Sequence, residues 1–129
     1  MAKSILIIDD EISSRSALRE IFEYLNYEVY TACNGEDGVK SYRRITTDIV
    51  LTDIYMPVKD GLETIREIKK EFPEAKIIAM SDSNKYSMNF FQVAIDFGAI
   101  DCIRKPFEPD DIIRIVNFTL GGNIAENAA

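Results

Sequence analysis

The chain alternates short apolar runs with longer amphipathic segments, and this alternation recurs five times. The apolar runs cover residues 5–8 (ILII), 28–32 (EVYTA), 48–52 (DIVLT), 76–80 (KIIAM) and 100–103 (IDCI). Runs this short, mostly rich in Ile, Val, Leu or Tyr, are typical of strands. Because the runs are continuously apolar, we expect a parallel sheet that right-handed crossovers cover on both faces. The sequence therefore predicts an α/β fold with a doubly wound, five-stranded parallel sheet.

The segments between the predicted strands repeat apolar residues at helical spacing. These residues are Ala17, Leu18, Ile21, Phe22 and Leu25; Val39, Tyr42 and Ile45; Leu62, Ile65, Ile68 and Phe72; the stretch 87–97; and Ile112, Ile113, Val116 and Leu120. Ser13 or Ser14 is expected to cap the first helix, and Asn34 the second. Pro73 is expected to end the third helix, and Gly98 has the position of a C-terminal glycine after the fourth.

Length and composition limit the classes of protein to which the chain can belong. Its 129 residues fit one domain, expected over residues 1–120, with a small polar tail at 121–129. The net charge of −7 disfavours nucleic-acid binding, and no apolar run approaches the roughly 20 residues of a membrane-spanning helix. Without a secretory signal the expected location is cytoplasmic, where Cys33 and Cys102 would be free thiols. Histidine is absent, which excludes nucleophile systems that use it as the base.

Polar residues follow the predicted strands at the edge where doubly wound sheets carry their functional groups. Asp9 and Asp10 follow the first strand, and Asp53 ends the third. Ser81 ends the fourth strand, and Lys105 follows the fifth. If the strand order is 2-1-3-4-5, the first and third strands are neighbours. The three carboxylates would then share one pocket.

Three carboxylates in one pocket repel one another, at a cost on the order of 1 to 4 kcal/mol for two charges about 4 Å apart. A hard divalent cation among the oxygens would offset this cost. Magnesium fits best, because it takes one or two carboxylates directly and keeps several waters. Lys105 would add a positive charge that can hold an anion. These residue types together favour the binding of a phosphoryl group beside Mg²⁺.

Taken singly, each of these residues also has a structural explanation. The pair Asp9 and Asp10 fits the charge pattern of a helix N-terminus ahead of Ser13. Lys105 fits a solvated surface lysine, and Asp53 fits a strand-terminal cap. Their joint occurrence at the ends of four strands favours a functional site over accident.

Three stretches together form a specific signature: ILIIDDE at 5–11, DIVLTDIYMPVKDG at 48–61 and IRKPF at 103–107. They resemble the first strand and acidic pair, the phosphoacceptor strand and loop, and the lysine-proline turn of the receiver domain of bacterial two-component response regulators. Pro57 and Gly61 lie at that family's spacing. The resemblance spans residues 3 to about 120. It implies a flavodoxin-like, CheY-like (βα)5 fold with strand order 2-1-3-4-5.

The resemblance also implies roles for the acidic residues. Asp53 would be the phosphoacceptor, taking a phosphoryl group from the phosphohistidine of a sensor histidine kinase, from a phosphotransfer protein or from a small acyl phosphate. Asp10 and Asp53 would bind Mg²⁺ directly, and Asp9 would bind it through water. The backbone carbonyl of Tyr55 would complete the protein ligands.

The same resemblance assigns the remaining polar residues of the site. Lys105 would bind one phosphoryl oxygen, and Ser81 would reach another once the group is attached. Phosphorylation adds charge and strong acceptors, which gives the loop after Ser81 a reason to move inward. The chain would thus be a signalling domain that takes part in its own phosphoryl transfer, not an enzyme.

Three departures from the family pattern affect the expected switch. Cys102 stands where the family usually has Tyr or Phe, three residues before the lysine. Asp82 follows the switch hydroxyl, where a small residue is usual, and its charge could repel a phosphoryl group. The segment 81–105 is about two residues longer than usual.

The fourth predicted helix is a candidate for the output surface. Phe90, Phe91, Ala94 and Phe97 share one helical face, which is enough to cover the sheet. Met88 and Ile95 lie beside this stripe, either as boundary residues covered by neighbours or as a docking patch. The face made by helix 4, strand 5 and helix 5 is therefore the expected binding surface for a downstream protein.

Three functions compete on the sequence alone. The first is a phosphorylation-controlled switch, and the second is a phosphate-independent receiver-like interaction module, which Cys102 and Asp82 suggest. The third is an aspartyl-nucleophile phosphatase of the haloacid dehalogenase type, which calls for two Asp residues two positions apart after the first strand. Here Asp9 and Asp10 are adjacent. We expect no output domain, so the chain would act by docking or be part of a larger regulator.

Overall fold

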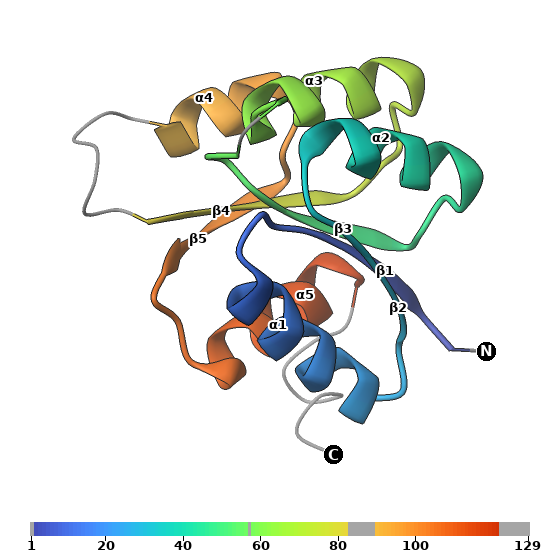
Figure 1. Cartoon of the computed structure of the whole chain (residues 1–129), viewed down its shortest axis with the longest axis vertical. Coiled ribbons are helices and arrows are strands. Elements are labelled where there is room, and N and C mark those ends of the chain that lie inside the picture. Colours follow the sequence, from blue (N-terminus) through green and yellow to red (C-terminus); the bar gives the residue numbers. More distant parts are fainter. Residues whose placement is uncertain (1, 57, 83–89, 122–129) are drawn as a thin grey trace.

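In the part of the chain that the structure describes, five strands and five helices alternate (Figure 1). The computed structural model describes residues 2–56, 58–82 and 90–121. The elements are β1 (Ser4–Ile8), α1 (Ile12–Tyr24), β2 (Glu28–Ala32), α2 (Gly35–Arg44), β3 (Ile49–Asp53), α3 (Gly61–Glu71), β4 (Ile77–Asp82), α4 (Phe90–Phe97), β5 (Asp101–Lys105) and α5 (Pro109–Thr119). Apart from Gly121, the expected tail at 121–129 lies outside the described residues.

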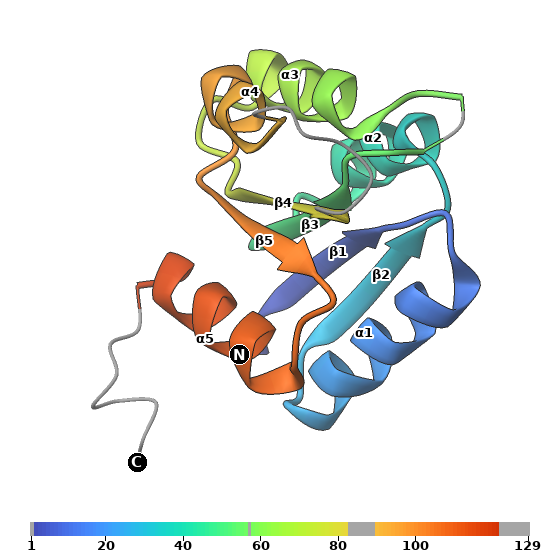
Figure 2. The same ribbon diagram turned by 90° about the vertical axis from the view of Figure 1, so that its left-hand side faces the viewer.

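The strands form one parallel sheet in the order β2-β1-β3-β4-β5 (Figure 2). The predicted fold class and strand order are therefore confirmed. In this order β1 and β3 are neighbours, with Ile8 paired to Thr52. The carboxyl ends of the two strands thus lie side by side, which brings together the residues that follow them.

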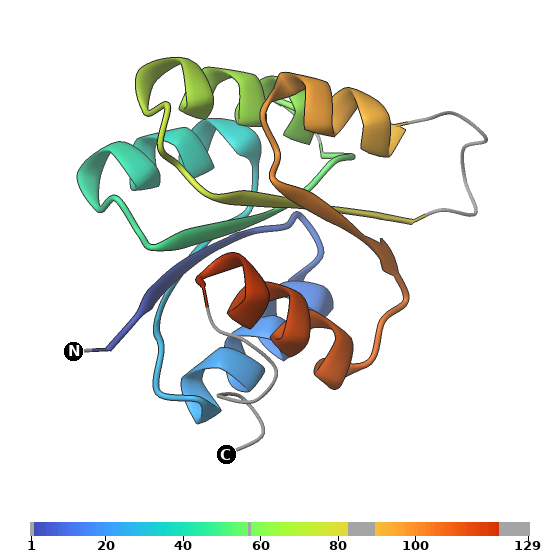
Figure 3. The same ribbon diagram turned by 180° about the vertical axis from the view of Figure 1, so that it is seen from behind.

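Two apolar cores cover the two faces of the sheet. In Figure 3, α2, α3 and α4 lie on one side of the sheet and α1 and α5 on the other. In β1, Leu6 and Ile8 belong to the first core, whereas Ile5 and Ile7 belong to the second. All four side chains are fully buried. The strand has to be apolar throughout because successive side chains enter opposite cores.

The ends of several helices follow the sequence-based predictions. Asn34 caps α2 by accepting a hydrogen bond from the backbone N–H of Asp37 at 2.8 Å. Gly98 ends α4 with a φ of +123°, a backbone conformation that residues other than glycine rarely adopt. The helix α3 ends two residues before Pro73, as expected.

The predicted cap of α1 was wrong. The N-cap is Glu11, which is extended, and its side chain makes no capping hydrogen bond. Neither Ser13 nor Ser14 has the capping position, because α1 already begins at Ile12. The hydroxyl of Ser14 instead donates to the side chain of Asp9 at 2.7 Å. The buried carboxylate of Asp9 needs hydrogen-bond donors, and this need outweighs the preference of serine for a capping position.

Some strand boundaries also differ from the prediction. The strand β5 covers Asp101–Lys105 instead of 100–103, so Lys105 is the last residue of the strand and does not follow it. The strand β4 continues one residue past Ser81. Arg104 is exposed, as the outer side of an edge strand allows, whereas the side chain of Lys105 is mostly covered and paired with Asp9 and Asp53. In the described part of the chain, every helix is too short or too polar to cross a membrane.

Candidate functional site

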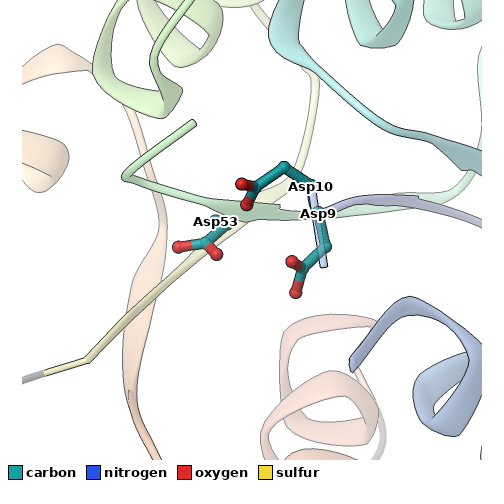
Figure 4. A group of neighbouring side chains, drawn as sticks. All are labelled: Asp9, Asp10 and Asp53. Carbon is teal, nitrogen blue, oxygen red and sulfur yellow. The ribbon is translucent and has the colours of Figure 1, made fainter. Parts of the chain in front are cut away.

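Three carboxylates meet at the carboxyl ends of β1 and β3, as the sequence predicts. Asp9 and Asp10 directly follow β1, and Asp53 is the last residue of β3. Figure 4 shows the three side chains side by side at this edge of the sheet. One oxygen from each lies within 4.8 Å of the others. Asp9 and Asp53 are buried, whereas Asp10 is exposed.

The ammonium of Lys105 joins this group from β5. Its Nζ lies 2.8 Å from Oδ2 of Asp9 and 3.2 Å from Oδ2 of Asp53. The side chain of Asp9 is fully buried and that of Asp53 is 9% exposed, so these are ion pairs shielded from water. The predicted convergence of Asp9, Asp10, Asp53 and Lys105 is therefore present.

The hydrogen bonds of Asp9 involve three residues that the sequence analysis did not place in the site. Oδ1 accepts the backbone N–H of Glu11 at 3.0 Å, and Oδ2 accepts the hydroxyl of Ser14 at 2.7 Å. The Arg15 guanidinium donates through Nη1 to the backbone carbonyl of Asp9 at 2.7 Å. The signal available in the sequence was the position of Ser14 and Arg15 in the first turn of the helix that follows the acidic pair.

The pKa of Asp53 reflects its burial and the charges around it. Burial raises the pKa of Asp53 to about 6, and the negative charge of Asp9 adds to this effect. The ammonium of Lys105 and the backbone N–H of Tyr55, which lies 3.4 Å from Oδ1, act in the opposite direction. Burial alone would lower the pKa of Lys105, but its contacts with Asp9 and Asp53 raise it. Lys105 is therefore protonated, yet its single positive charge does not balance the negative charges of the neighbouring carboxylates.

The donor set fits a hard divalent cation. Three carboxylates lie within reach of one ion, and carboxylate oxygens are the ligands that Mg²⁺ prefers. The raised pKa of Asp53 shows that further positive charge would stabilise its ionised form. Tyr55 lies two residues beyond Asp53, beside the cluster. That its carbonyl acts as a ligand stays a prediction.

Ser81 lies near the same edge of the sheet, in β4. Met80 pairs with Asp53, so Ser81 is one residue beyond the register position of the phosphoacceptor candidate. Its side chain is buried, with the residue only 4% exposed. The loop that would carry it inward, residues 83–89, lies outside the described residues. The predicted movement of Ser81 is therefore untested.

The two residues that depart from the family pattern, Asp82 and Cys102, have defined surroundings. Asp82 is half-buried, pairs in register with Lys105 and lines with it an open pocket of about 430 Å³. Cys102 is half-buried in β5, and its thiol donates to the carbonyl of Phe91 at 3.6 Å. Burial, with a smaller contribution from Asp101, raises the pKa of this thiol to about 11. Cys102 and Cys33 are both free, as predicted.

The helix α4 covers the sheet as expected. Ala94 is fully buried, and Phe90, Phe91 and Phe97 pack against the first core. Ile95 is 42% exposed beside this stripe. Met88, the other residue of the predicted docking patch, lies outside the described residues.

Comparison with known proteins assigns this arrangement to a family. The family model of the response regulator receiver domain matches residues 5–117. The chain belongs to this family. A receiver domain is a signalling domain, and the haloacid dehalogenase hypothesis is therefore set aside.

Curated relatives match this receiver domain along most of their length. The chemotaxis protein CheY of Thermotoga maritima is 40% identical over 118 residues, covering 91% of this chain and 97% of that protein. The protein CcdB of Bacillus subtilis is 35% identical, with the same coverage of 91% and 97%. The resemblance thus extends over essentially a whole CheY-type protein.

Solved structures share the receiver fold. A CheY-like receiver domain protein of Methanospirillum hungatei has a TM-score of 0.87 at 27% identity, covering 93% of this chain and 94% of that one. CheY of Borrelia burgdorferi, solved as a CheX-CheY-BeF3-Mg²⁺ complex, has a TM-score of 0.83 at 27% identity, covering 90% of this chain and 87% of that one. That complex contains a magnesium ion and a CheX partner.

Proposed function

We propose that this receiver domain is a phosphorylation-controlled switch in which Asp53 accepts the phosphoryl group. A carboxylate oxygen of Asp53 attacks the phosphorus of a histidine-kinase phosphohistidine, of a phosphotransfer protein or of a small acyl phosphate. The new bond joins phosphorus to that oxygen. The bond from phosphorus to the donor nitrogen or oxygen breaks, and its electron pair leaves with the donor.

Mg²⁺ fits this proposal as the resident metal. Asp10 and Asp53 would hold it directly, Asp9 through water, and Tyr55 through its backbone carbonyl. When bound, it supplies positive charge that neutralises the acids and the transferred group. The Asp9 carboxylate, already held by three donors, would keep its orientation throughout.

Lys105 and Ser81 bind the transferred group in this proposal. The ammonium of Lys105 lies 3.2 Å from Oδ2 of Asp53, so a phosphoryl oxygen attached there would be within its reach. Ser81 would donate its hydroxyl to another oxygen. Positioning and charge neutralisation are the main tasks of a protein in phosphoryl transfer.

The shared position of Lys105 between Asp9 and Asp53 is the observation that carries the proposal. A structural ion pair would need only one carboxylate for one ammonium. Here one lysine is paired with two buried carboxylates, the exposed carboxylate of Asp10 lies beside them, and the pKa of Asp53 stays raised. Such an excess of buried negative charge is costly unless cations complete the site.

Incubation with Mg²⁺ and acetyl phosphate tests the proposal. Intact mass spectrometry should show the added mass of one phosphoryl group on the wild type. Asp53→Asn should show none, and the matched variant Asp48→Asn, at the opposite end of β3, should behave as the wild type. Equal uptake by Asp53→Asn, or no uptake by the wild type, would contradict the proposal.

Cys102 favours a second candidate, a phosphate-independent interaction module with the receiver fold. The thiol occupies the position from which an aromatic side chain would swing in the family's usual switch, and it is held against Phe91. In this alternative, partner binding would be equal for the wild type and Asp53→Asn. Under the first proposal, only the wild type would change its binding after incubation with acetyl phosphate.

The proposed partners follow from the proposed switch. A sensor histidine kinase or phosphotransfer protein would supply the phosphoryl group in the cytoplasm. A downstream protein would bind the face formed by α4, β5 and α5, where Ile95 is exposed. We propose residues 1–120 as the switching unit. No direct contact with nucleic acid or membrane is part of this proposal.

A further inference from the structure

The hydroxyl of Ser14 closes a ring of hydrogen bonds with Asp9 and Lys105. Ser14 Oγ lies 2.7 Å from Oδ2 of Asp9 and 3.3 Å from Nζ of Lys105. Nζ of Lys105 in turn lies 2.8 Å from the same Asp9 oxygen. Three residues from α1, the β1–α1 loop and β5 are therefore connected pairwise.

The donors and acceptors of this ring fix the direction of each bond. A serine hydroxyl has one donor, and an ionised carboxylate accepts only, so Ser14 donates to Asp9. The oxygen of Ser14 then accepts from Lys105, because an ammonium only donates. Lys105 has three N–H groups, and their three partners are Asp9, Ser14 and Asp53.

We propose that Ser14 is a positioning residue for phosphoryl transfer, acting through Lys105. This inference rests on the proposed function of Asp53. Two N–H groups of Lys105 are held by Asp9 and Ser14, which leaves the third directed at Oδ2 of Asp53. That N–H is the one that meets a phosphoryl oxygen on Asp53. Without the Ser14 hydroxyl, the ammonium has a free N–H and can rotate about its bond to Asp9.

The alternative is a purely structural role for Ser14, which the experiments must distinguish from the positioning role. In that role its hydroxyl would only satisfy an oxygen of buried Asp9, and its loss would loosen the whole site. Mg²⁺ affinity and phosphorylation would then decline together. In the positioning role, Mg²⁺ affinity is preserved, because among the described residues Ser14 has no hydrogen bond to Asp10 or Asp53, the proposed direct ligands. Asp9, proposed to bind the ion only through water, would still be held by Glu11 and Lys105.

Initial rates of phosphoryl uptake from acetyl phosphate, followed by intact mass, provide the first test. Ser14→Ala should react roughly threefold to tenfold more slowly than the wild type, the effect of one hydrogen bond. Ser13→Ala is the matched control, because Ser13 is the exposed neighbour on the same turn of α1. It should react at the wild-type rate. Calorimetry should give Mg²⁺ dissociation constants within about twofold for all three proteins.

A double-mutant cycle with Lys105→Met provides the second test. If Ser14 acts through Lys105, Ser14→Ala should cause no further loss of rate in the Lys105→Met background. The same fold loss in both backgrounds would overturn the inference, as would equal rates for Ser14→Ala and Ser13→Ala. A wild type that takes up no phosphoryl group would overturn the proposed function itself, and the inference with it.

Discussion

In metal-free protein, replacement of Asp53 by Asn is expected to stabilise the fold at neutral pH. The wild-type carboxylate is buried beside Asp9, and these two causes raise its pKa to about 6. Asn has nearly the same shape without the charge. The variant therefore removes an unfavourable ionisation while leaving the packing at the end of β3 in place.

The sign and size of the effect follow from proton linkage. The unfolded state loses the Asp53 proton near the ordinary pKa of 3.8, and the folded state loses it near 6. Between these values the folded state binds more protons, so the free energy of unfolding falls as pH rises. The loss is complete above pH 6. About two pH units, at about 1.4 kcal/mol each, correspond to roughly 3 kcal/mol.

Urea unfolding followed by circular dichroism, with EDTA present, measures this difference. At pH 7.5 Asp53→Asn should be more stable than the wild type by about 2 to 3 kcal/mol, and near pH 4 the two should converge. Added Mg²⁺ should stabilise the wild type more than the variant. Glu20→Gln, at an exposed position of α1, controls for the change in net charge.

A variant that is less stable than the wild type at every pH would refute the reasoning. Such a result would mean that the bond between Asp53 and Lys105 outweighs the burial of the carboxylate. A stability difference that does not depend on pH would also contradict it, since the effect would then not come from ionisation.

Three further predictions concern other parts of the fold. Gly61→Ala should lower the free energy of unfolding by at least about 1 to 3 kcal/mol in a urea titration, because the new Cβ would lie 2.0 Å from the Asp53 carbonyl oxygen. At pH 8 a thiol reagent should label exposed Cys33 quickly and Cys102 slowly, since burial raises the pKa of the latter thiol to about 11; equal rates would show that Cys102 is accessible. Val58→Asn should raise the melting temperature by an amount equivalent to roughly 1 kcal/mol, because Val58 has a φ of +72°, which a β-branched residue adopts only under strain.

The architecture and the members of the site could be predicted because they depend on strand ends. Continuous apolar runs required a parallel sheet, and neighbouring β1 and β3 then brought Asp9, Asp10 and Asp53 together. Lys105 belonged to the same edge because β5 runs parallel to the others. Topology alone thus determined which charges would meet.

The hydrogen bonds within the site could not be predicted in the same way. Ser14 was read as a helix cap because capping preferences are local, whereas its real partner is a buried acid whose orientation depends on the fold. The end of β5 was placed too early, because charged residues on an edge strand carry no apolar signal. Side-chain directions depend on the whole packed site and not on any short segment.

The contact between Lys105 and Asp9 has a mechanical consequence. It ties the end of β5 to the end of β1, two strands that do not pair with each other because β3 and β4 separate them. A single ammonium thus links the carboxyl ends of two strands that have no backbone hydrogen bonds with each other. Negative charge gained at Asp53 would attract the ammonium of Lys105. Because Lys105 ends β5 and the backbone then leads into α5, a shift of this lysine would be transmitted to α5.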